Sequence, residues 1–266
     1  MRQRPRLAFA ATAVGLLAAV SGCAGGPVRA DSQPAIPATT TPSPSVDRTV
    51  TGTYRPLAAP TGEPSRPPSS PARPPAVPGF HSSVAPVTAA ALPYSYRAGC
   101  PVPPEQLRLL HLRFWGFDAT SHVGVLVVNA AVVPAVLAIF RELYDARFPI
   151  RRMELVDAFH ASDPDSMAAD NTSAFNCRYA VAPGPPQWSA HAYGEAIDVD
   201  PVENPYLEGG KVQPPDGAGY VNRGDVRPGM AVPGGTLPAA FAANGWYWGG
   251  RWTSSPDYQH FSSTGG

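Results

Sequence analysis

The stretch SAHAYGEAIDVD, residues 189–200, carries the densest chemical pattern of the chain. Its second half alternates as a strand does: Ala196 and Asp198 would face one side, and Ile197 and Val199 the other. His191 precedes this predicted strand over 194–199, and Gly194 allows a turn between the two. The alternation therefore predicts a strand with one face toward a core and a second face that brings a carboxylate close to an imidazole.

The segments on either side predict further elements. Apolar and β-branched runs indicate strands over residues 122–128, 153–159 and 175–181, and a closing strand over 246–252. Residues 130–148 have apolar side chains at helical spacing, with Pro134 in the first turn. Residues 236–244 predict a short helix, with Thr236 as its N-cap and Gly245 just past its end. Because strands and helices mix without regular alternation, the expected fold class is α+β, a small antiparallel sheet with flanking helices.

The beginning of the 266-residue chain has the composition of an export signal. Three arginines in residues 1–6 precede an apolar run over residues 7–20, which is shorter than the about 20 residues that span a bilayer. The run ends in Ser21-Gly22-Cys23 and resembles a lipobox, so residues 1–22 are a predicted lipoprotein signal peptide and Cys23 the predicted lipidation site. An ordinary signal peptide with an unrelated cysteine is the alternative.

Residues 23–93 are rich in Pro, Ala, Ser and Thr and show no periodic apolar face. Such a composition cannot bury enough surface to offset its chain entropy. It predicts a disordered tether, and a folded domain over residues 94–266. The protein is thus expected to be exported and held by a lipid at the outer face of a bacterial membrane, in the cell wall zone.

The cysteines indicate a candidate disulfide, and the charge balance argues against nucleic-acid binding. Lipidation of Cys23 would leave Cys100 and Cys177 as a disulfide pair in an oxidising compartment, with two buried thiols as the alternative. Lys plus Arg equals Asp plus Glu at 20 each, and without the three arginines of residues 1–22 the chain has 17 basic and 20 acidic residues. This balance gives no basic surface for nucleic acid, and we expect a monomer.

Two histidines and two aspartates form a candidate metal site. Zinc binds imidazole nitrogen and carboxylate oxygen, and a catalytic site supplies three protein ligands and leaves one position open. His191 and Asp198 could supply two ligands and His260 a third. Asp257, three residues before His260, could transfer a proton. The aromatic group of Trp246, Tyr247, Trp248 and Trp252 could line a cleft or fill the core.

These residues carry a resemblance to a known family. The residues 189–198 match the pattern S-x-H-x-x-G-x-A-x-D of the D-alanyl-D-alanine carboxypeptidase family, which includes vancomycin-resistance D,D-peptidases and the L-alanyl-D-glutamate endopeptidases of phage lysins. Asp257-Tyr258-Gln259-His260-Phe261 resembles the family's second signature. The resemblance covers roughly residues 100–261 and implies a zinc peptidase domain of the hedgehog/D,D-peptidase-like fold.

The resemblance also implies roles for single residues. His191, Asp198 and His260 would be the Zn²⁺ ligands, and Asp257 the general base and acid. Arg178 would polarise the scissile carbonyl and stabilise the oxyanion, or else be only a surface ion-pair partner. Asp170 and Ser173 are candidates for substrate contacts, and Ser189 for supporting the His191 loop.

The implied activity is zinc-dependent hydrolysis of an amide bond in the peptidoglycan stem peptide. A D,D-carboxypeptidase and an L-alanyl-D-glutamate-type endopeptidase remain open, since such enzymes share ligands and differ in the walls of the cleft. The alternative is a zinc-containing lipoprotein that binds the cell wall without catalysis. Structural zinc sites usually have four ligands and favour cysteine, whereas this pattern offers three ligands and a proton-transfer carboxylate.

Overall fold

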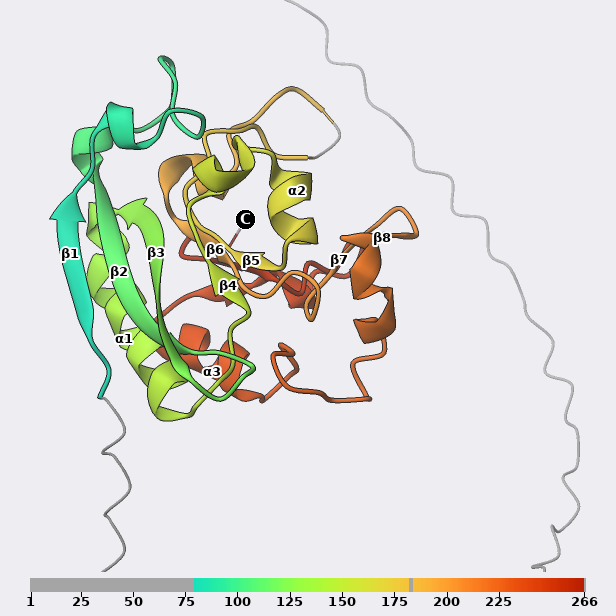
Figure 1. Ribbon diagram of the computed structural model, residues 1–266. Helices are drawn as coiled ribbons and strands as arrows, with labels where there is room; N and C mark the ends of the chain where they lie inside the picture. Colours follow the sequence, from blue (N-terminus) through green and yellow to red (C-terminus); the bar gives the residue numbers. More distant parts are fainter. Residues whose placement is uncertain (1–78, 182–183, 266) are drawn as a thin grey trace, which may run out of the picture. The chain divides into compact units, whose positions relative to one another are not determined.

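The computed structural model describes residues 79–181 and 184–265 (Figure 1). The predicted signal peptide over 1–22, the lipidation site Cys23 and the first part of the tether lie outside the described residues. The tether was expected to continue to residue 93, but Ser82–Pro86 forms a paired strand. The predicted domain boundary at residue 94 is therefore too late: Val87 and Leu92, which follow this strand, are buried in the domain.

The first sheet consists of three antiparallel strands in the order β1-β2-β3. They are β1 (Ser82–Pro86), β2 (Leu107–Trp115) and β3 (Ser121–Asn129). The strand predicted over residues 122–128 is β3, and its long partner β2 had no counterpart in the sequence-based prediction. A tight turn at residues 116–120 joins β2 and β3, so they pair along their full length, from Trp115–Ser121 to Leu107–Asn129.

One face of this sheet is covered by α1 (Val133–Asp145), as Figure 1 shows. The helix confirms the periodicity read over residues 130–148, and Pro134 lies in its first turn. Its stripe of Val136, Ile139, Phe140 and Leu143 is fully buried against Leu110, Leu112 and Leu126 of the sheet. The second long helix, α3 (Thr236–Ala243), adds Leu237 and Phe241 to the same core, with Gly235 rather than Thr236 at its N-cap.

A second small sheet carries the other wall of this core. It has the order β6-β10-β9, with β6 (Ala196–Asp198), β9 (Tyr247–Trp248) and β10 (His260–Ser262). In the antiparallel register, Phe261 lies opposite Ile197 and His260 opposite Asp198. Phe261 and Ile197 are fully buried in the core. Because side chains alternate along a strand, His260 and Asp198 must then share the opposite face.

Short elements connect the two sheets. The parallel pair of β4 (Arg152–Met153) and β5 (Asn171–Thr172) lies in the middle of Figure 1, and α2 (Asp163–Ala168) precedes β5. A hairpin of β7 (Tyr206–Glu208) and β8 (Lys211–Gln213) follows β6. The arrangement confirms an α+β fold with small antiparallel sheets. No helix in the described parts of the chain is long and apolar enough to cross a membrane.

The disulfide between Cys100 and Cys177 is present. Cys177 lies in a second apolar cluster, together with Leu107, Val127 and Phe175, beneath the segment that follows β1. The link spans 77 positions of the chain. It therefore ties the N-terminal part of the domain to the segment that leads toward His191.

Three predicted strands are shorter or absent. Of the strand predicted over residues 153–159, only Met153 belongs to β4. Val156–Phe159 forms a 3-10 turn instead, in which Asp157 accepts hydrogen bonds from the backbone of Tyr94 and Ser95. Phe175, Asn176 and Cys177 each donate to a different segment, and residues 178–180 pair briefly with residues 187–189, so no continuous strand forms over 175–181. The predicted closing strand over 246–252 ends at Trp248, and β10 forms the centre of the sheet instead.

Candidate metal centre and its cavity

Three side chains converge on the polar face of the second sheet. His191 Nε2 lies 3.1 Å from Asp198 Oδ2, His260 Nδ1 lies 3.1 Å from Asp198 Oδ1, and the two ring nitrogens are 3.3 Å apart. All three residues are buried, and their candidate ligand atoms lie within 4.8 Å of one another. Two imidazole nitrogens and a carboxylate at such spacing match the donor set of a catalytic zinc site.

The orientation of His191 favours metal binding. Its Nδ1 lies 2.7 Å from the carbonyl oxygen of Ala174. Since a carbonyl can only accept, Nδ1 carries the proton, and Nε2 keeps a free lone pair that faces Asp198 and His260. Ser189 Oγ accepts a hydrogen bond from the His191 backbone nitrogen at 3.3 Å and caps the turn, as expected for a residue that supports this loop.

Gly194 has a steric reason to be in the motif. It has φ +68°, and a Cβ there would lie 2.6 Å from the backbone nitrogen of Asn129. That nitrogen donates a 2.8 Å hydrogen bond to the Gly194 carbonyl. The turn between His191 and Asp198 is thus packed directly on the end of β3, where no side chain fits.

The charges in the site act on one another. Burial alone would raise the pKa of Asp198, but His191 and His260 outweigh it and hold this pKa well below its usual range. Asp257 behaves in the opposite way, because burial and the negative charge of Asp198 raise its pKa to about 7. The Asp257 Oδ1 atom is shielded from solvent and has no hydrogen-bond partner within residues 79–181 and 184–265. A carboxyl with a pKa near neutrality exchanges protons readily at neutral pH.

These groups line a cavity of about 660 Å³. Trp252 and Tyr193 are partly exposed on its wall, and the Trp252 ring centroid lies 5.4 Å from that of His260. Trp246 and Trp248 are buried in the core, so the aromatic group divides between the two roles considered for it.

Arg178 also lines the cavity and forms a 2.9 Å ion pair with Asp163 of α2. Trp252 was considered as a cleft residue from its sequence, whereas Asp163 was not singled out there, because it belongs to no motif.

Comparison with known proteins agrees with this geometry. Residues 183–263 match the sequence model of a family described as D-alanyl-D-alanine carboxypeptidase. This segment belongs to that family. It contains His191, Asp198, Asp257 and His260, and it ends before the last residues of the chain, whereas Arg178 precedes it. No curated protein and no solved structure matches the chain significantly.

Two predicted substrate contacts precede this D-alanyl-D-alanine carboxypeptidase segment and lie outside the cavity. Ser173 pairs through its backbone with Asp198 and does not line the cavity. Asp170 accepts a hydrogen bond from the Val202 nitrogen at 2.9 Å and forms an ion pair with Arg151 at 3.3 Å. Both residues thus hold the segment around β6 in place, and their predicted contact with substrate has no support in the geometry.

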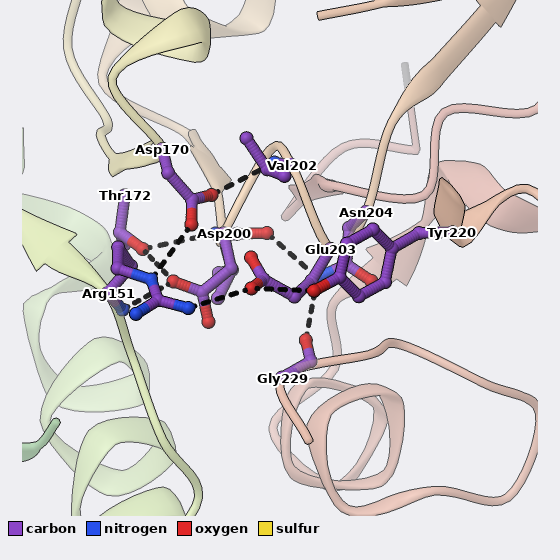
Figure 2. A network of polar contacts seen from close by, with 10 residues as sticks. Arg151, Asp170, Thr172, Asp200, Val202, Glu203, Asn204, Tyr220 and Gly229 are labelled. Carbon is purple, nitrogen blue, oxygen red and sulfur yellow. Dashed lines mark hydrogen bonds and ion pairs between the residues drawn. The ribbon is translucent and has the colours of Figure 1, made fainter. Parts of the chain in front are cut away.

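Asp170 is one member of a polar network that includes Arg151, Asp200 and Glu203 (Figure 2). Arg151 also donates from its backbone nitrogen to Asp200 at 2.8 Å and from its guanidinium to Glu203 at 3.2 Å. Asp200 follows β6 with φ +44°, and its side chain is completely buried. The network therefore ties the chain that leaves Asp198 to the ends of β4 and β5.

The network contains three carboxylates and one arginine, and this imbalance changes their titration. Burial, and then the hydrogen bond with Asp170, raise the pKa of Glu203 to about 7. Burial and the charge of Asp170 also raise the pKa of Asp200. The folded protein therefore favours the protonated form of Glu203, which can donate a hydrogen bond to Asp170.

We expect Gly194→Ala to destabilise the domain by about 2–4 kcal/mol, from strain at positive φ and from the contact with the Asn129 backbone. It should also weaken zinc binding, because the His191 turn must move. The matched control is Gly245→Ala, which has φ +79° but no atom within 4 Å of the added Cβ. Chemical denaturation and a zinc titration measure both effects; equal losses in the two variants would show that the close packing is unimportant.

The second prediction concerns Glu203→Gln. Because folding raises the pKa of Glu203, the unfolded state loses its proton first, and this group's contribution to stability is lost as pH rises from about 4.5 to 7. Glutamine resembles the protonated acid, so the variant should lose this dependence and gain on the order of 2 kcal/mol relative to wild type between pH 5 and pH 8. Urea denaturation at both pH values measures it, with the exposed Glu105→Gln as the control. An unchanged pH dependence would contradict the assignment.

Proposed function

We propose that the protein is a zinc-dependent peptidase that hydrolyses an amide bond in the peptidoglycan stem peptide. The observation that carries this proposal is the buried group of His191, Asp198 and His260 at the wall of a cavity, inside the segment matched to the family. The family's description supports the substrate class. A hedgehog/D,D-peptidase-like fold is part of the same proposal and agrees with the mixed α+β architecture.

The donor set fits a zinc ion. His191 Nε2, His260 Nδ1 and one oxygen of Asp198 would hold it, and the hydrogen bond to Ala174 fixes His191 in the required tautomer. When bound, zinc supplies a Lewis acid that lowers the pKa of a coordinated water and polarises a carbonyl. Three protein ligands leave a position open, which favours a catalytic site over a closed structural one.

The chain's own residues supply the proton transfer. Asp257 lines the cavity, and no group in the described part of the chain bonds to its Oδ1, so this carboxyl can accept a proton from the attacking water. The same carboxyl can then return the proton to the leaving amine. The solvent-shielded surroundings favour both steps, because a carboxyl with a pKa near neutrality loses and regains a proton at little cost.

Arg178 is suited to bind the oxygen on which negative charge develops. Its Nε is shielded from solvent and has no partner among the residues that the structure describes, while one Nη is paired with Asp163. A guanidinium has five N–H donors, so donors remain for a substrate carbonyl. The favoured role is therefore an electrostatic one within the cavity, beside the candidate metal ligands.

The cellular setting stays a proposal from sequence. The basic and apolar residues 1–22 and the lipobox at Cys23 support export and a lipid anchor on the outer face of a bacterial membrane. That location would bring the domain to its proposed substrate, since peptidoglycan lies outside this membrane.

The direct test is digestion of purified peptidoglycan with the zinc-loaded protein, read by mass spectrometry. We expect a product that disappears with a chelator and returns with added zinc. Loss of a single terminal D-alanine would identify a carboxypeptidase, and cleavage within the stem an endopeptidase. If a folded, zinc-loaded protein yields no product from several wall types but still binds them, the non-catalytic alternative is supported instead.

Replacing Asp257 separates metal binding from proton transfer. Asp257→Asn and Asp257→Ala should reduce turnover by roughly 10²- to 10⁴-fold, because the proton acceptor is lost. The zinc content should stay at the wild-type level, since the three candidate ligands are intact. The exposed Asp145→Asn on α1 is the control. Turnover within about twofold of wild type in Asp257→Ala would show that this carboxyl is not the base.

A further inference from the structure

An aspartate outside the family segment touches the residue proposed to stabilise the oxyanion. Asp163 Oδ2 lies 2.9 Å from an Nη of Arg178, and both side chains adjoin the cavity that contains the candidate metal ligands. About a quarter of each side chain is exposed, so the pair is partly shielded from solvent. Both charges also contribute to the pKa values of His191 and Asp257, after the larger effects of burial and of Asp198.

The main chain on the Asp163 side is firmly held. Asp163 is the first residue of α2, and Ser162 caps this helix through the Asp165 nitrogen. Ser166 and Met167 on the inner face of α2 are buried. The Met167 sulfur accepts a hydrogen bond from the side chain of Gln259, the neighbour of His260. The carboxylate of Asp163 therefore belongs to a helix that is linked, through Gln259, to the segment just before the candidate ligand His260.

Arg178 is fixed in its main chain but not in its side chain. Its carbonyl accepts from the Ser189 nitrogen, and its neighbour Cys177 is held by the disulfide. The ion pair with Asp163 is the one polar contact of the guanidinium within the described parts of the chain. An arginine side chain has about 2 kcal/mol of rotamer entropy, so without this contact it would sample several directions.

We propose that Asp163 is a positioning residue, which holds the Arg178 guanidinium so that its free N–H donors face the substrate carbonyl. The proposal rests on the function proposed above and assigns to it a residue outside the matched segment. Pairing one Nη with a fixed carboxylate removes most of the torsional freedom of a planar group, and the remaining N–H donors then point in defined directions. A donor held before the reaction starts costs no reorganisation when charge develops.

An alternative role for Asp163 is purely electrostatic. Its negative charge raises the pKa of both Asp257 and His191, and it could influence the reaction through these groups without Arg178. The two roles predict different behaviour when Arg178 is absent. A positioning effect disappears with the arginine, whereas a charge effect on Asp257 remains.

The kinetic test is a double-mutant cycle of Asp163→Ala and Arg178→Ala in the full-length, zinc-loaded protein. We expect Asp163→Ala to lower kcat by roughly 10- to 100-fold, with a smaller change in KM and unchanged zinc content. Asp163→Asn, which keeps an acceptor without the charge, should recover part of this loss. Asp163→Ala should have an effect of less than about twofold in the Arg178→Ala background; an undiminished loss there would overturn the proposal.

A second readout does not depend on activity. The ¹⁵Nε relaxation of Arg178, assigned from the signal missing in Arg178→Lys, reports the order of its guanidinium. We expect an ordered side chain in wild type and in Asp165→Ala, which removes an exposed carboxyl from the same turn of α2, and a mobile one in Asp163→Ala. Equal order in Asp163→Ala would refute the proposal. An inactive wild-type protein would contradict the proposed function, and the relaxation would still decide whether Asp163 fixes Arg178.

Discussion

The pairing of β6 with β10 is the constraint on which the site depends. Three residues of each strand pair, and this short register places His260 directly opposite Asp198 and Phe261 opposite Ile197. The apolar pair is buried in the main core, so the polar pair must face the cavity. A slip by one residue would exchange the two faces, burying an imidazole in the core and exposing a phenylalanine. The core therefore fixes the geometry of two candidate ligands.

The position of the remaining candidate ligand, His191, depends on a different contact. His191 belongs to a 3-10 turn that packs through Gly194 onto the end of β3, and its ring is oriented by the carbonyl of Ala174. That carbonyl belongs to the extended segment that follows β5. The first sheet thus contributes to the site even though none of its residues is a candidate ligand, because it is the surface against which the His191 turn is placed.

Polar groups away from the cavity serve a supporting role. Arg151 joins the carboxylates of Asp170, Asp200 and Glu203 behind β6, and Asp163 joins Arg178 beside the cavity. Behind β6 the excess of carboxylate over arginine is met by protonation, which is why the pKa of Glu203 lies near 7. Beside the cavity, Arg178 and Asp163 instead form a single ion pair. This difference separates a network that holds the backbone from a pair suited to orient one side chain.

The sequence by itself determined several elements of the fold and the candidate ligands. The alternation over residues 194–199 and the helical stripe over 130–148 identified β6 and α1, because each is a short-range pattern. The resemblance of two motifs to a known family indicated the three candidate ligands. The pairing of Cys100 with Cys177 followed from the cysteine count.

Only the tertiary structure decided the rest. Residues 175–181 are extended, but their partners come from several distant segments, and β10 is too short and too polar to be recognised without β6 beside it. Asp170 was expected in the cleft and lies behind β6, and Asp163 entered the cavity without any motif, because the position of α2 depends on long-range packing that no local pattern records.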